Sequence, residues 1–248
     1  MQDRVKVLCQ NTATEVEVEM GITLGELLSR LDIKGQYPIL AAYVNNRLKE
    51  LNSRLFKPAV VRFIDITHFE GYRVYQRTIS FILHKAVWDL YDNRKFYIRH
   101  SLGRGFYCEF DDDKPITDEE IEALRKRMQE IIASRYPIHR KRLQTKEING
   151  IYEQFGFEDK IALLNTRPRL YSDIYSMDDI VGYFYGALAP STSYIHLYDL
   201  KPYYNGIYIA VPCRTAPDTL ESQVAQDKMF DVFQEYKHWV DVMGVSTV

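Results

Sequence analysis

The first 65 residues alternate between strand-type and helix-type patterns of apolar positions. Residues 5–9 and 15–19 run or alternate apolar and flank a polar turn, which predicts a hairpin. Thr23 and Glu26 have the spacing of a helix capping box, and leucines follow at helical intervals as far as Leu31. Further strand-type segments complete an α+β unit: 39–44, 48–51 and 60–65.

A longer helix and an aromatic strand follow. Residues 77–90 carry apolar side chains at three- and four-residue steps, which predicts a helix with one buried face. Gly103 and Gly105 precede an aromatic strand at 106–110. A second capping box, Thr117 to Glu120, starts a helix that Pro137 ends. Helices are also predicted from Thr145 to Phe155 and over 160–164.

The last part of the chain predicts a hairpin and a terminal helix. Segments 195–200 and 207–211 are expected to pair across Tyr204-Asn-Gly206, which is a strong turn signal. An amphipathic helix is expected to begin at Thr219, with Gly244 as its stop. The whole pattern indicates an α+β protein.

Composition and charge narrow the class of protein. Of 248 residues, 46% are apolar and 27% charged, as in ordinary folded proteins, and the net charge of −2 gives no global attraction to nucleic acid. The three cysteines form no Cys-x-x-Cys pair, so neither a zinc knuckle nor a disulfide framework is expected, and we expect a reducing, cytoplasmic setting. No segment has the length and apolarity of a membrane span, so no membrane partner is expected.

Two segments resemble parts of threonyl-tRNA synthetases. The order of elements in 1–66 resembles their β-grasp TGS domain, and Gly105-Phe-Tyr-Cys-Glu-Phe110 resembles a strand of their editing-type second additional domain. The resemblance implies three regions: a TGS-like domain at 1–66, an editing-type α+β domain at 67–215, and at 216–248 a long helix leading to a missing C-terminal domain.

The resemblance also indicates where the family's metal ligands would fall. Its His-x-x-x-His pair corresponds to Arg77 and Phe81, and its later cysteine and histidine correspond to Phe184 and Leu188. Phenylalanine and leucine cannot bind a metal, so we expect no metal site and no catalytic residue of the family type. His84 and His100 could still meet in one pocket with Tyr107, although a lone helical histidine is more often structural. The candidate relic pocket comprises Arg77, Phe81, His84, His100, Tyr107, Phe184 and Leu188.

A basic cluster is the second candidate site. It includes Arg135, Arg140, Lys141 and Arg142. A solvated strand face explains such a cluster in most proteins, and contact with RNA or phosphate is the alternative.

The full arrangement further resembles the front part of bacterial uridine kinase-like nucleoside kinases, on 63–68, 71–75 and 236–247. No phosphate-binding Gly-x-x-x-x-Gly-Lys-Ser/Thr loop occurs in the chain. This resemblance implies a non-catalytic accessory or regulatory region, with its own C-terminal kinase domain as partner and a nucleoside, nucleotide or RNA as possible ligand. ATP and Mg²⁺ would serve that kinase domain, and no cofactor is expected in these residues.

Two other functions remain open. The first is a metal-independent editing hydrolase of mischarged aminoacyl-tRNA that uses His84, His100 and Tyr107. The second is an RNA-binding module that uses the basic cluster from Arg135 to Lys146.

Overall fold

The computed structural model describes residues 3–33, 35–91, 94–112, 114–167, 169–220 and 227–243. Its fold is α+β, as the sequence pattern predicts. The elements follow one another in this order: β1 (Arg4–Cys9), β2 (Thr14–Glu19), α1 (Leu24–Arg30), β3 (Ala41–Val44), β4 (Arg47–Glu50), β5 (Ala59–Ile64), α2 (Phe69–Leu90), β6 (Phe96–Leu102), β7 (Gly105–Phe110), α3 (Asp118–Ala133), β8 (Ile138–Gln144), α4 (Thr145–Gln154), α5 (Glu158–Asn165), β9 (Tyr171–Met177), β10 (Ile180–Gly182), the short 3-10 helix η1 (Thr192–Tyr194), β11 (Asp199–Tyr203), β12 (Gly206–Ala210) and α6 (Asp227–Met243).

The first five strands form a β-grasp sheet. Their order is β2-β1-β5-β3-β4, with β1 parallel to β5 and the other neighbours antiparallel. Helix α1 begins at the predicted capping box, in which the Thr23 hydroxyl accepts from the Glu26 amide and Glu26 accepts from the Thr23 amide. Alternating strand residues such as Val5 and Val7 bury one face of the sheet beneath Leu24 and Leu27 of α1.

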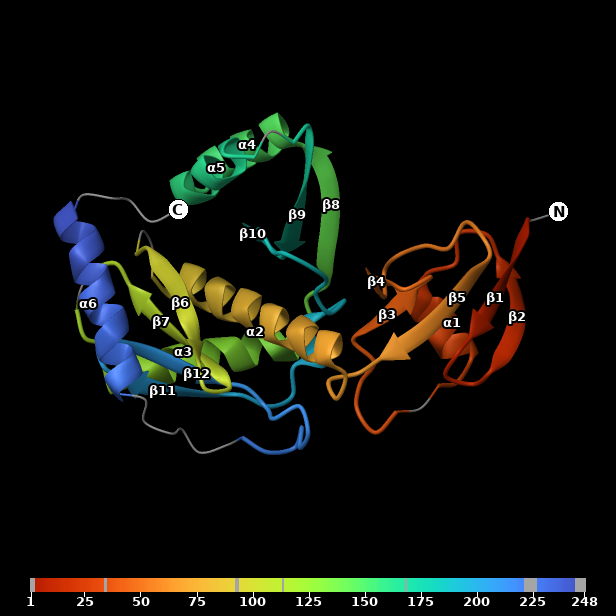
Figure 1. Ribbon diagram of the computed structural model, residues 1–248, viewed down its shortest axis with the longest axis horizontal. Helices are drawn as coiled ribbons and strands as arrows, with labels where there is room; N and C mark the ends of the chain where they lie inside the picture. Colours follow the sequence, from red (N-terminus) through yellow and green to blue (C-terminus); the bar gives the residue numbers. More distant parts are fainter. Residues whose placement is uncertain are drawn as a thin grey trace.

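Helix α2 lies at the centre of the remaining structure (Figure 1). The four-stranded sheet β11-β12-β7-β6 and the helix α3 pack against it, and β10 of the three-stranded sheet β10-β9-β8 contacts it as well. These neighbours bury residues on several sides of α2, including Ile79, Phe81, Ile82 and Leu83. Leu40 and Ile64 of the β-grasp sheet join the same core, so the first sheet also packs against this part of the molecule.

Three elements differ from the sequence-based prediction. Helix α2 begins at Phe69 rather than at residue 77, because the His68 side chain accepts from the Glu70 amide and starts the helix two turns earlier. Residues 195–198 are not strand: η1 occupies 192–194 and β11 begins at Asp199. Thr219 is not helical, and the described helix starts at Asp227; the expected stop at Gly244 lies outside the described residues.

The remaining predicted elements are found close to their expected bounds. The hairpin turn is confirmed at Tyr204 and Asn205, where Tyr203 pairs with Gly206. Helix α3 starts at its predicted capping box, with Thr117 accepting from the Glu120 amide. The three cysteines are all reduced and buried. Within the residues that the structure describes, no helix is long and apolar enough to cross a membrane.

The joint between the β-grasp sheet and α2 depends on a close backbone approach at Gly71. A Cβ atom at this position would lie 1.8 Å from the Asp65 carbonyl oxygen. We expect Gly71→Ala to lower the free energy of unfolding by about 1–3 kcal/mol, because the backbone must shift to remove the overlap. Urea denaturation measures the change.

Gly150, in the middle of α4, is the matched control, since a Cβ there meets nothing within 4 Å. Gly150→Ala should leave stability unchanged or raise it by up to about 1 kcal/mol, as alanine is the better helix former. Equal stability losses in the two variants would contradict the close approach at Gly71.

Candidate functional site

The positions that correspond to metal ligands in the synthetase family are closed by side chains. Phe81 of α2 packs on Phe184, with ring centroids 5.1 Å apart, and the Phe184 ring also contacts Tyr175. Phe81 and Leu188 are fully buried. Arg77 is half-buried: its Nε donates to the Ala187 carbonyl oxygen at 2.9 Å, and its guanidinium lies against Gly186. The other three positions lie in one hydrophobic cluster, with Phe81 and Leu188 inside it and Phe184 packed against it.

The segment 186–189 is fixed through its backbone at four consecutive residues. The Tyr175 hydroxyl contacts the Gly186 oxygen at 2.7 Å, and Arg77 binds the Ala187 oxygen. The Leu188 amide donates to Glu50 Oε1 at 3.4 Å, and the Ala189 amide donates to the Thr78 hydroxyl at 2.9 Å. Glycine is suited to position 186 because φ is +125° there and the Arg77 guanidinium occupies the space of a Cβ. The segment therefore has little freedom to reopen.

Glu50 connects the β-grasp sheet to this segment and carries unusual proton chemistry. One hydroxyl, that of Tyr175, lies within hydrogen-bond distance of both the Gly186 carbonyl and Glu50 Oε1. A hydroxyl has one hydrogen and a carbonyl only accepts, so both contacts are satisfied when Glu50 is protonated and donates. Burial raises the pKa of Glu50, and this effect outweighs the opposing hydrogen bond from Tyr175 and the charge of Arg140.

His100 and Tyr107 lie elsewhere. Tyr107 packs with Phe230 of α6 and donates from its hydroxyl to Glu109 at 3.0 Å, while its neighbour Cys108 faces the α2 side of the sheet. His100 stacks on Phe233 of α6 with ring centroids 4.0 Å apart. Because strand residues alternate between faces, His100 and Tyr107 lie across the sheet from His84. The seven candidate residues therefore do not form one pocket.

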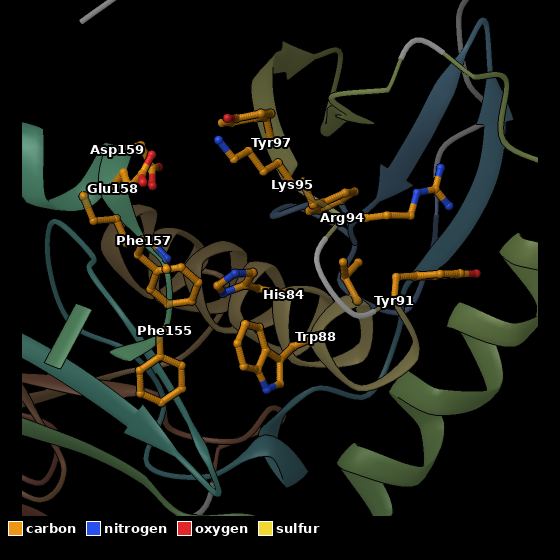
Figure 2. Close-up of a pocket in the computed structure, with 14 residues that line it drawn as sticks. His84, Trp88, Tyr91, Arg94, Lys95, Tyr97, Phe155, Phe157, Glu158 and Asp159 are labelled. Carbon is orange, nitrogen blue, oxygen red and sulfur yellow. The ribbon is translucent and has the colours of Figure 1, made fainter. Parts of the chain in front are cut away.

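His84 instead lines a pocket between α2, β6 and the α4–α5 connection (Figure 2). The cavity has a volume of about 240 Å³. Aromatic rings form a continuous wall: Trp88 contacts Phe155 and Phe157 at 5.5 and 5.8 Å, and Phe157 contacts His84 at 5.6 Å between centroids. In Figure 2, Lys95 and Tyr97 lie along the rim opposite Glu158 and Asp159, whereas Arg94 points away.

The pocket combines a neutral imidazole with a desolvated amine. Burial, with a smaller effect from the charge of Lys160, lowers the pKa of His84 to about 3, so His84 is neutral at pH 7. Its ring then offers one donor and one acceptor nitrogen. Burial also lowers the pKa of Lys160 to about 8, with its Nζ 3.5 Å from the Phe157 ring centroid. Neither side chain hydrogen-bonds to the described part of the chain, and Lys160 forms no ion pair there.

Sequence reasoning found His84 but missed the rest of this pocket. Trp88 was within reach, because Arg77, Phe81, His84 and Trp88 follow one another at helical spacing along one side of α2. Phe155, Phe157 and Lys160 could not be assigned, since nothing in their local pattern shows that the α4–α5 connection folds back over α2.

The basic candidates are spread over β8 and the turn before it. Arg135 is exposed in that turn, with a left-handed backbone (φ 52°). Arg140 is bound in an ion pair with Asp173 at 2.6 Å. Lys141 and Arg142 are exposed and form no ion pair with the described residues, and strand alternation places them on opposite faces.

Metal-ligating side chains do not gather at any of these places. Across the described ranges, no three His, Cys, Asp or Glu side chains are placed to hold one ion. The four positions that the resemblance relates to metal ligands carry Arg77, Phe81, Phe184 and Leu188, which fill this part of the α+β fold.

Several threonine–tRNA ligases are similar in sequence to this chain. No family model matches the chain. A threonine–tRNA ligase of Symbiobacterium thermophilum is 28% identical over 185 residues, covering 74% of this chain and 28% of the relative. Those of Caldanaerobacter subterraneus and Orientia tsutsugamushi are 27% and 29% identical, covering 78% and 77% of the chain and 30% of each relative. The chain thus spans less than a third of the length of these relatives.

These matches correct the expected function. The prediction of an accessory region of a uridine kinase-like protein is wrong, because the relatives found are threonine–tRNA ligases. The resemblance to a nucleoside kinase rested on short stretches without a P-loop, and such stretches can be shared by any chain with the same two-part fold. The expected ATP, Mg²⁺ and kinase-domain partner depended on that prediction alone.

Glu50 gives a pH-dependent stability that can be measured. Its pKa is raised in the folded state, so its stabilising contribution is complete below the unfolded pKa and is lost as pH rises through the folded pKa. We expect Glu50→Gln to be more stable than the original protein at pH 8, because the uncharged amide avoids the cost of a buried carboxylate. Urea midpoints from pH 4 to 8 give the comparison.

At pH 4 the original protein should be at least as stable as Glu50→Gln, since a protonated Glu50 Oε1 can both donate to Tyr175 and accept from the Leu188 amide, whereas one amide atom cannot do both. Glu26→Gln serves as the control, because Glu26 is exposed in the α1 capping box and its pKa is lowered by its hydrogen bonds to Thr23. It should lose stability as its carboxylate is removed at pH 8. The stability of Glu50→Gln is compared with that of the original protein at each pH. A difference that moves against Glu50→Gln between pH 4 and pH 8 would contradict a protonated Glu50 that donates to Tyr175.

Proposed function

We propose that this chain is a tRNA-synthetase-related RNA-binding module that does not use a metal. The observation that carries the proposal is the match to threonine–tRNA ligases over about three quarters of the chain. The absence of a metal from the proposal rests on the packing of Phe81 on Phe184, at two of the positions that the resemblance relates to metal ligands. RNA binding does not require hydrolysis, because exposed cations can contact the RNA phosphates and exposed aromatic rings can stack on its bases.

The division of the chain belongs to the same proposal. The β-grasp sheet is contained within Arg4–Ile64, and the other two sheets lie between Phe96 and Ala210. This supports a TGS-like domain at 1–66, an editing-type domain at 67–215 and a helical segment at 216–248.

The RNA contact is assigned to the outer end of β8. Arg142 is exposed and without an ion pair in the described structure, and its strand neighbour Asp173 is occupied by Arg140. Tyr171, paired with Gln144 two positions further on and 48% exposed, lies on the same face of the sheet. A guanidinium and an aromatic ring on one face suit a phosphate and a stacked base. Lys141 adds charge from the other face.

We do not extend the proposal to hydrolysis by His84, His100 and Tyr107. General acid–base work on one ester requires these groups within hydrogen-bond reach of the same atoms. The sheet separates His84 from the other two, so they cannot act on one substrate. A deacylation assay with serine-charged threonine tRNA should give the same rate with protein as with buffer.

Replacing the exposed cations tests RNA binding. In Lys141→Met/Arg142→Met, we expect the affinity for a threonine tRNA transcript to fall and the dependence of log affinity on log salt to become shallower by about 0.7–0.9 per lost phosphate contact. Filter binding or fluorescence anisotropy between 50 and 200 mM salt, roughly the range over which such contacts are resolved, gives both values.

The control removes the same charge elsewhere. Lys57 and Lys126 are exposed and form no ion pair in the described structure, and Lys57→Met/Lys126→Met should bind as the original protein does. An original protein whose RNA binding is absent, or is independent of salt, would refute the proposed function. So would equal losses in the two double variants.

A further inference from the structure

The pocket beneath the α4–α5 connection has features of a ligand site that the proposed RNA contact on β8 does not use. It is concave and largely aromatic, and it holds a few polar groups that have no partner in the described structure. Its volume of about 240 Å³ lies just below the range of about 300–1,000 Å³ typical of small-molecule sites. One ring system with a short substituent fits such a volume better than an extended strand.

The aromatic wall favours a planar ring. Trp88 is 37% exposed and is held by ring contacts with Phe155 and Phe157, so part of its indole is accessible to a stacking ligand. His84, one helical turn before Trp88, presents a neutral ring with one donor and one acceptor nitrogen. The edge of a nucleobase also carries donors and acceptors side by side, so it can hydrogen-bond to such a ring.

The charges at the pocket favour an anion on the same ligand. Lys160 has no ion pair within the described residues, and its ammonium lies 3.5 Å from the ring centroid of Phe157 and 5.9 Å from that of Tyr152. Lys95 lies on the rim without an ion pair in the described structure (Figure 2). The carboxylates of Glu158 and Asp159, across the rim from Lys95, can accept from sugar hydroxyls, and the charge of Asp159 also acts on Lys160, whose pKa it raises against the larger effect of burial.

We propose that this pocket binds a single nucleotide, with its base stacked on Trp88, its base edge at His84 and its phosphate at Lys160. The ligand chemistry is a nucleobase joined to a phosphate, and its source is either a free mononucleotide or the terminal nucleotide of an RNA. The inference goes beyond the proposed function and rests on the pocket, so it can be tested with nucleotides alone.

Trp88 provides the readout. Trp239 is the second tryptophan of the chain, and Trp239→Phe leaves Trp88 as the only one. In this background, titration with the four ribonucleoside 5′-monophosphates should quench the Trp88 fluorescence with at least one of them. The matching nucleoside should bind at least about tenfold more weakly, since a hydrogen bond to a charged group is lost. Inorganic phosphate alone should cause no quenching.

Variants separate stacking from charge. Lys160→Met should weaken nucleotide binding about tenfold and leave nucleoside binding unchanged. Trp88→Leu, followed by calorimetry, should weaken both ligands. Lys126→Met is the matched control and should change neither. Because the pKa of Lys160 is lowered to about 8, nucleotide affinity should also fall between pH 7 and 9. Absence of binding by all four nucleotides, or normal binding in Lys160→Met, overturns the inference.

A last comparison distinguishes the two sources and keeps the two proposals apart. A short RNA with a free 3′ end that competes with the nucleotide in the Lys141→Met/Arg142→Met protein indicates a terminal nucleotide as ligand. Competition by free nucleotide only indicates a mononucleotide. Nucleotide binding without tRNA binding would leave the pocket assigned and refute the proposed function, and the converse result would refute the pocket alone.

Discussion

Burial of helix α2 on several sides is the constraint on which the rest of the structure depends. The helix contacts α3, β6, β10 and η1, and its side chains share one core with Leu40 and Ile64 of the β-grasp sheet. Tyr75 illustrates the effect: its hydroxyl donates to the Leu197 carbonyl and accepts from the Leu197 amide, which fixes the loop before β11 to the helix. Such partners matter because an unsatisfied buried polar group costs about 1–3 kcal/mol.

The same constraint explains why the positions that the resemblance relates to metal ligands are filled by large side chains. Unfilled space in a buried region is costly, because residual cavity volume lowers stability. Phe81 and Phe184 fill the space together, since each ring packs on the other. Arg77 turns its guanidinium to the Ala187 carbonyl, and the four backbone contacts of 186–189 then hold the segment closed. Further along α2, His84 and Trp88 line the pocket, while Lys85 is buried in ion pairs with Asp89 and Asp179.

Local patterns predicted the elements well and their spatial combinations poorly. Both capping boxes, at Thr23 and Thr117, were readable because their contacts lie within four residues. The early start of α2 was missed because histidine at position 68 acts as an N-cap, a role more common for serine, threonine or aspartate. The joint pocket for His84 and His100 was predicted because both residues lie close in sequence to the same motif. The two are separated because strand residues alternate between the faces of a sheet, and the sequence does not show which face of β7 meets α2. The pairing of Lys160 with His84 across a helix connection has no sequence signal at all.

The proposed RNA contact on β8 and the pocket beside α2 are two separate places, and the packing between them determines whether binding at one changes the affinity of the other. Arg142 lies on a sheet face that also carries Tyr175, and Tyr175 contacts both Glu50 and the fixed segment 186–189. The pocket lies along α2 from that segment, beyond Phe81. Two packed routes connect the two places. One passes through Phe81 and Phe184, and the other through α4, which packs on β8 and β9 and shares a hydrophobic cluster with Phe157 of the pocket wall. Packed cores have discrete rather than continuously variable arrangements. Since four backbone hydrogen bonds hold segment 186–189 in place beside Phe184, a change in affinity at one site on occupation of the other would pass through α4.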